Sequence, residues 1–71
     1  MTAPEMLTAE SITEDQIREL WSTCKPEDRY GGHTVAGTCR EALGELHLHG
    51  STQAGARRRC AELINMRRSA S

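Results

Sequence analysis

Three cysteines and three histidines are the residues of this chain that could form a metal site. They lie between positions 24 and 60: Cys24, His33, Cys39, His47, His49 and Cys60. Structural zinc takes four thiolate or imidazole ligands, usually supplied by closely spaced pairs such as Cys-x2-Cys or His-x3-His. No such pair occurs here, and the three cysteines fall on apolar helical stripes, where free cysteine packs as a small hydrophobic residue. The spacing therefore favours core thiols and solvated histidines over zinc, and no cofactor is expected.

A cysteine nucleophile is the second chemistry that these residue types allow. A reactive thiolate needs a neighbouring histidine or a helix N-terminus, within a cleft, to lower its pKa. His33 precedes the expected helix that carries Cys39, but no orienting aspartate or oxyanion-type glycine arrangement accompanies the pair. The stretch GGHTVAGT also lacks the lysine of a phosphate-binding loop. We therefore expect a protein that is not an enzyme.

Charge is divided unevenly along the chain, although the formal net charge is only −1. Residues 1–33 carry seven acidic and three basic side chains, whereas residues 51–71 carry five arginines and one glutamate. A chain divided in this way can bind a charged partner with one end or pair head to tail with a second copy, and either end can also be simply solvated. The acidic candidates for partner contact are Glu14, Asp15 and Glu19.

A polar arc on the third expected helix is the basic candidate surface. At about 100° per residue, it brings together Arg57, Arg58, Asn65 and Arg68, with the small Ala54 and Ala61 between them. Such a ridge would let a backbone or a phosphate approach closely, as in helices that bind nucleic acid. The net charge, the isoelectric point of about 6.3 and the acidic first helix argue against nucleic acid. An acidic protein partner and plain solvation are the alternatives.

Hydrophobic periodicity predicts three helices that must position these residues. Their expected ranges are 13–25, 34–47 and 52–67. Thr13 and Gln16 form a capping-box pattern at the start of the first helix, and Pro26 ends it. Gly44 is expected inside the second helix on its polar side, and Gly50 is suited to a helix end or turn.

The expected fold is a small all-α domain of three helices. Residues 25–33, with proline, aspartate and two glycines, indicate a loop. The short connection after the second helix predicts an antiparallel hairpin of the second and third helices, with cysteines on their inner faces. The domain is expected over residues 12–68, preceded by a disordered tail at 1–11 and followed by a flexible end at 69–71.

Composition limits where and how this chain can act. With 71 residues, 37% of them hydrophobic, the chain can bury only a thin core, so the chain is expected as a monomer or a homodimer. No signal-peptide pattern precedes the odd number of cysteines, which favours a reducing cytoplasm. No apolar run approaches the roughly 20 residues of a membrane span, so no membrane association is expected.

The order of these motifs resembles short helical open reading frames of phages, prophages and plasmids. The matching features are ITEDQIREL, a central Val followed by Cys-x2-Ala-Leu-x-Glu, and a closing Ala-Arg-x2-Cys-Ala-Glu-Leu-Ile, within residues 12–64. The KPEDRYGGH loop and the His-Leu-His turn depart from that pattern. The resemblance implies an architecture without established activity, so it carries over no functional residues. It does imply a mobile-element accessory protein, a class that commonly acts by binding a host protein.

The sequence therefore favours non-catalytic protein binding, with modulation or inhibition of a host or defence protein as the expected role. The alternative is a small nucleic-acid-binding accessory protein that uses the arginines of the third helix. A small zinc-binding domain is the second alternative.

Overall fold

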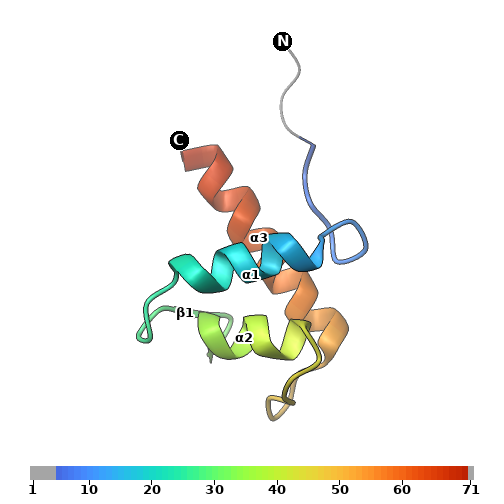
Figure 1. Ribbon diagram of the computed structural model, residues 1–71, viewed down its shortest axis with the longest axis vertical. Coiled ribbons are helices and arrows are strands. Elements are labelled where there is room, and N and C mark those ends of the chain that lie inside the picture. Colours follow the sequence, from blue (N-terminus) through green and yellow to red (C-terminus); the bar gives the residue numbers. More distant parts are fainter. Residues whose placement is uncertain (1–4, 71) are drawn as a thin grey trace.

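The structure is a computed structural model that describes residues 5–70. Its elements in chain order are α1 (Glu14–Thr23), β1 (Arg29–Tyr30), β2 (His33–Thr34), α2 (Val35–Ala42) and α3 (Gln53–Ala70). In Figure 1, α3 runs back obliquely across α2, and α1 contacts both helices. The three expected helices are confirmed. A two-stranded sheet makes the expected all-α class only approximate.

The first helix begins at the expected capping box. The Thr13 hydroxyl accepts a hydrogen bond from the Gln16 backbone N–H at 3.2 Å, and the Gln16 side chain accepts one from the Thr13 N–H at 2.8 Å. The helix ends at Thr23, two residues before the expected boundary. A residue that precedes proline is disfavoured in helical conformation, and Cys24 already adopts an extended backbone ahead of Pro26.

The expected loop over residues 25–33 contains a short β-hairpin. Arg29 pairs with Thr34 and Tyr30 with His33 in antiparallel register. The turn is Gly31-Gly32, with φ of 64° and 84°, and two-residue hairpin turns require such positive φ values. Two-residue strands are too short to produce an alternating hydrophobic pattern, so the sequence does not reveal them.

The second helix ends at Ala42, five residues before the expected boundary. Gly44 takes a left-handed φ of 80°, and its N–H donates to the Glu41 carbonyl at 2.9 Å. The next N–H, of Glu45, donates to the Arg40 carbonyl at 2.8 Å, which completes a Schellman-type helix end. The expectation of Gly44 inside the helix is therefore wrong, because this glycine terminates it. Gly50 lies in a turn, as expected.

The third helix is longer than expected. Thr52 caps it, since its hydroxyl accepts a hydrogen bond from the Gly55 N–H at 3.0 Å. The helix continues through Ala70, so residues 69 and 70 of the expected flexible end are helical. Residue 71 of that end and residues 1–4 of the expected tail lie outside the described residues. Within residues 5–70, no helix is both long and apolar enough to cross a membrane.

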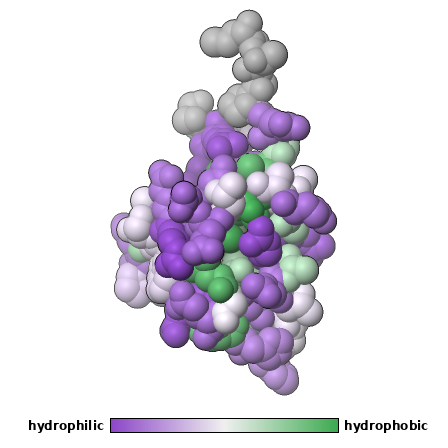
Figure 2. Space-filling model, turned by 45° about the vertical axis from the view of Figure 1, so that its right-hand side comes forward, coloured by the Kyte–Doolittle hydropathy of each residue, from purple (hydrophilic) through white to green (hydrophobic). Residues whose placement is uncertain are grey.

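The core is thin and lies where the three helices meet. Its fully buried members come from the predicted stripes and from positions beside them: Ile12, Ile17, Leu20, Val35, Cys39, Ala42, Ala56, Cys60 and Ala61. Figure 2 shows hydrophobic side chains that reach the surface in a broken band between hydrophilic ones. The core therefore leaves apolar surface uncovered, including Met6 and Met66.

Replacement of Gly44 tests the helix end. Gly44→Ala should lower the free energy of unfolding by about 1–2 kcal/mol, because alanine is strained at positive φ. Gly44→Asn adds the same Cβ near the Gln53 side-chain nitrogen, but asparagine tolerates a positive φ. The free energy of unfolding should therefore fall less than in Gly44→Ala. Urea unfolding of both variants measures the difference, and equal losses would show that backbone strain is not the cause.

Candidate functional site

The three cysteines lie in the core or pack against it. Cys39 and Cys60 are fully buried in the core, and the half-buried Cys24 donates its thiol hydrogen to the Trp21 carbonyl at 3.2 Å. Burial raises the pKa of the Cys24 thiol, and the Asp28 carboxylate adds to this effect. A hydrogen bond with Cys60, together with burial, raises the pKa of Cys39. Both thiols with a raised pKa stay protonated at neutral pH, which is unlike a nucleophile or a metal ligand.

The three histidines lie in the loops and the hairpin. His33 belongs to β2, whereas His47 and His49 are exposed in the loop between α2 and α3. Within residues 5–70, no three cysteine, histidine, aspartate or glutamate side chains are grouped so that they could hold a metal ion. The zinc alternative therefore gains no support from the geometry.

The three acidic candidates are exposed along α1: Glu14, Asp15 and Glu19. Glu19 lines a shallow hollow together with Arg67 and Arg68 of α3. The acidic α1 and the basic end of α3 are thus adjacent in space. A duplex that approached the end of α3 would meet acidic side chains there, as expected if α1 lay nearby.

Asn65 binds a segment near the N-terminus, residues 5–11, which we call the N-terminal arm. The Asn65 side chain is buried in this contact. Its amide donates a hydrogen bond to the Leu7 carbonyl and accepts one from the Leu7 N–H, both at 2.9 Å. A side-chain amide that satisfies both backbone groups of one residue fixes the position of an extended segment. The arm therefore lies against α3, where the sequence predicts a disordered tail.

Two arginines of the expected polar arc also bind the arm and the residue that follows it. Arg57 donates to the carbonyl oxygens of Ala9 at 3.0 Å and of Ile12 at 2.6 Å. Arg68 donates to the Glu5 carbonyl at 3.4 Å. Charge-assisted hydrogen bonds of this kind are stronger than neutral ones, so they reinforce the arm's position.

The arm changes the character of the polar arc. Arg58 is the only one of its four candidate residues without a hydrogen bond to residues 5–12, and its guanidinium lies 4.0 Å from the Glu62 carboxylate. Ala61, expected on the polar side, is 1% exposed and lines a hollow together with residues 6–10 of the arm. The arc is thus largely occupied by the chain's own backbone.

A buried carboxylate, that of Glu41, joins α2, the following loop and α3. The Glu41 side chain is 2% exposed. Its Oε2 lies 3.3 Å from His47 Nδ1 and accepts a hydrogen bond from the Leu48 N–H at 3.2 Å. Its Oε1 lies 3.5 Å from Arg59 Nη2, and that nitrogen donates to the Ser51 hydroxyl at 2.7 Å. Three segments therefore converge on one carboxylate.

Opposing effects act on the pKa of Glu41. Burial raises this pKa, because a charged carboxylate loses solvation. The Ser51 hydroxyl, the Leu48 N–H, and the charges of His47 and Arg59 act in the opposite direction. The resulting pKa lies below the ordinary value of 4.5, so Glu41 is ionised at neutral pH.

Glu41 and Arg59 carry little local signal in the sequence. Each stands beside a core position, Ala42 or Cys60, and next to an exposed arginine, Arg40 or Arg58. Their burial depends on the fold of the loop and on the hairpin turn. A Cβ at Gly31 would stand 2.8 Å from the Arg59 Cδ, so the absence of a side chain lets the turn approach this arginine.

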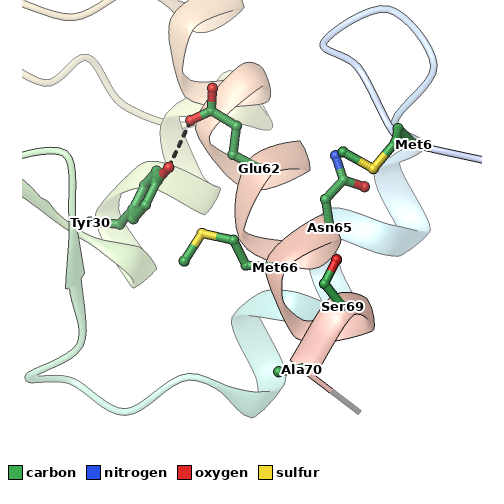
Figure 3. Close-up of a pocket in the computed structure, with 7 residues that line it drawn as sticks. All are labelled: Met6, Tyr30, Glu62, Asn65, Met66, Ser69 and Ala70. Atoms are coloured by element: carbon green, nitrogen blue, oxygen red, sulfur yellow. Dashed lines mark hydrogen bonds between the residues drawn. The ribbon is translucent and has the colours of Figure 1, made fainter.

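An open pocket lies beside α3, between the arm and the hairpin (Figure 3). Its volume is about 570 Å³, and its lining residues are Met6, Tyr30, Glu62, Asn65, Met66, Ser69 and Ala70. The Met66 side chain points from α3 toward Tyr30, and Met6 approaches Asn65 from the arm. Met6 is 67% exposed and Met66 54% exposed, and within residues 5–70 they are the exposed large hydrophobic residues. We call this hollow the Met6–Met66 pocket.

Tyr30 and Glu62 fix one wall of the pocket. The Tyr30 hydroxyl donates to Glu62 Oε1 at 2.9 Å, and this hydrogen bond raises the pKa of Tyr30. Glu62 Oε2 faces Arg58 Nε at 4.0 Å. The single carboxylate that lines the pocket thus has partners on both oxygens. The remaining lining consists of the two methionines, Ala70, the tyrosine ring and the Ser69 side chain. Such a surface is suited to an apolar side chain.

Acid titration tests the role of Glu41. Because its pKa is lower in the folded chain than in the unfolded one, its stabilisation is present above about pH 4.5 and is lost as the pH falls through the folded value. Glu41→Gln should lower the free energy of unfolding by about 2 kcal/mol at neutral pH. It should also flatten the loss of stability between about pH 5 and 3. Urea unfolding followed by Trp21 fluorescence measures both effects, and an unchanged pH slope would contradict the assignment.

Amide exchange tests the docking of the arm. Asn65→Ala removes the acceptor of the Leu7 N–H, so this amide should exchange roughly fivefold to tenfold faster, as expected from the loss of one hydrogen bond. Arg58→Ala is the matched control, since Arg58 lies on the same face and makes no hydrogen bond to the arm. Hydrogen exchange of the Leu7 amide, measured by NMR, distinguishes them. Equal exchange in wild type and Asn65→Ala would show that the arm is not held by Asn65.

No family model, curated protein or solved structure matches this chain. Family-level analogy therefore assigns it no activity, and the chemistry of its surfaces is the basis for a functional proposal.

Proposed function

We propose that this chain is a non-catalytic protein-binding domain that takes apolar side chains of its partner into the Met6–Met66 pocket. The observation that carries the proposal is the gathering of both exposed methionines on one hollow. Single exposed apolar residues are ordinary on a protein surface, whereas their grouping in a concave site marks an interaction surface. Methionine is flexible and polarisable, so it adapts to the shape of an incoming side chain.

The chemistry of the pocket supports binding over catalysis. Its one carboxylate, Glu62, is engaged by Tyr30 and faces Arg58, so it has no free position from which to act as a general base. The buried thiols of Cys39 and Cys60 are not among the residues that line it. We infer a domain that acts by occupying a surface of another protein.

The nucleic-acid alternative gains less support than protein binding. Three of its four candidate residues, Arg57, Asn65 and Arg68, donate hydrogen bonds to backbone oxygens of the chain itself. Arg58 faces Glu62, which offsets its charge. The role we propose is modulation or inhibition of a larger protein, such as a host or defence protein. This role does not depend on a mobile-element origin of the chain.

Site-specific crosslinking tests the proposal in cells that produce the protein. A photo-crosslinking phenylalanine derivative replaces Met66, and the same derivative replaces the exposed Glu27 as a matched control outside the pocket. We expect a discrete protein adduct from position 66 that position 27 does not give. Met6→Lys in the Met66-labelled chain should abolish the adduct, because a charged group would then enter the apolar pocket.

Two outcomes would overturn the proposal. The same adducts from positions 66 and 27 would show that the pocket has no selectivity. A position-66 adduct that nuclease digests would assign the surface to nucleic acid instead. Met6→Lys should change the free energy of unfolding by less than about 0.5 kcal/mol, as is usual for an exposed site, so misfolding is readily distinguished from lost binding.

A further inference from the structure

The Met6–Met66 pocket continues along α3 as a longer groove. A second hollow of about 460 Å³ is lined by residues 6–10 of the arm, by Arg58 and by Ala61. It shares Met6, Glu62 and Asn65 with the first hollow, so the two are adjacent. We call the two adjacent hollows the α3 groove. The arm forms one wall of this groove, and Tyr30 of the hairpin stands at the other side.

The floor of the α3 groove is a single helical stripe. Seven residues of α3 line it, of which Ala61 and Asn65 are buried and the other five are exposed: Arg58, Ala61, Glu62, Asn65, Met66, Ser69 and Ala70. They recur at intervals of three and four residues, as one face of a helix does. The stripe extends over about 18 Å, which is the length of about three helical turns. Rows of side chains with this spacing form the ridges and grooves on which a second helix packs.

A helix fits this groove better than an extended segment. An extended peptide gains affinity by hydrogen bonding to free backbone groups of its receptor. The N–H and the carbonyl of Leu7 in the arm wall are both bonded to Asn65, and the floor is a helix whose backbone groups bond to each other. A helical ligand forms its backbone hydrogen bonds internally, so it needs only an apolar contact surface.

The charges that line the groove favour a basic ligand. Its charged lining residues are Glu10, Glu62 and Arg58, and the last two lie 4.0 Å apart. Glu10 has no ion pair within residues 5–70. The arm wall therefore presents an unneutralised carboxylate, and a lysine or arginine beside the apolar stripe of a ligand would complement it.

We propose that the α3 groove binds an amphipathic helix of about three turns, which packs its apolar stripe on Met6 and Met66 and places basic side chains along the arm at Glu10. This inference rests on the proposed function and names the chemistry of the partner. Residues at i, i+4 and i+7 of the ligand would fill the groove, in the way that other grooves take amphipathic helices.

Three synthetic helices test this inference on the intact chain. They share one stripe of leucine and methionine, and their remaining positions are lysine, glutamine or glutamate. We expect the lysine helix to bind at least about tenfold more tightly than the glutamate helix, as measured by fluorescence anisotropy of the labelled peptides at low salt. Glu10→Lys should shrink this ratio to about twofold or less. Glu27→Lys, a matched charge reversal outside the groove, should preserve it.

Each other outcome overturns a defined part of the inference. Equal binding of the three helices would remove the charge preference and leave the proposed function intact. Undiminished binding of a proline-interrupted lysine peptide would show that the ligand is not helical. No binding by any peptide, or binding that Met66→Lys does not weaken, would remove the helix as the occupant. The crosslinking experiment at position 66 decides protein binding independently of all these results.

Discussion

The buried carboxylate of Glu41 is the interaction on which the arrangement of the other elements depends. It lies at the end of α2 and contacts both the loop that follows, at His47 and Leu48, and the guanidinium of Arg59 on α3. A carboxylate removed from water is strongly destabilising unless charge and hydrogen bonds compensate it. The loop supplies a hydrogen bond from Leu48 and the contact with His47 to Oε2, and Arg59 of α3 supplies a positive charge beside Oε1, which has no hydrogen bond within residues 5–70. This compensation is available only when the loop holds one position relative to α3. A thin core alone would specify this position weakly, because small apolar side chains repack at little cost.

The position of Arg59 links this buried site to the exposed pocket. Its side chain packs beneath the hairpin turn at Gly31, and the next residue back along that turn, Tyr30, reaches Glu62 on the following turn of α3. Asn65, three residues further on, holds the arm that carries Met6. One face of α3 therefore contacts, in succession, the buried carboxylate, the hairpin and the arm. The pocket is a consequence of three long-range contacts along one helix.

Local interactions are what the sequence predicts well. The capping box at Thr13 and the helical apolar stripes involve residues within a few positions of each other, and the structure confirms them. The end of α2 is harder to predict from the sequence, because a glycine at position 44 fits both a helix interior and a left-handed helix end. The apolar stripe also continues to Leu46, beyond the observed end. The all-α expectation fails at the hairpin, whose strands have only two residues each. The helical period also places Ala61 on the polar side, because the arm residues beside it are more than 50 positions away in the sequence.

The same limit explains why the candidate site could not be found from the sequence. Cys39 and His47 attract attention by their chemistry, yet the first packs in the core and the second faces Glu41. Met6 and Met66 give no functional signal in the sequence, because sixty positions separate them and each alone is an ordinary exposed residue. They share a pocket only after the side chain of Asn65, which belongs to the arc expected to face a partner, has bound the backbone of the arm. The polar arc thus acts within the chain: Asn65, Arg57 and Arg68 hold the backbone that forms one wall of the open pocket.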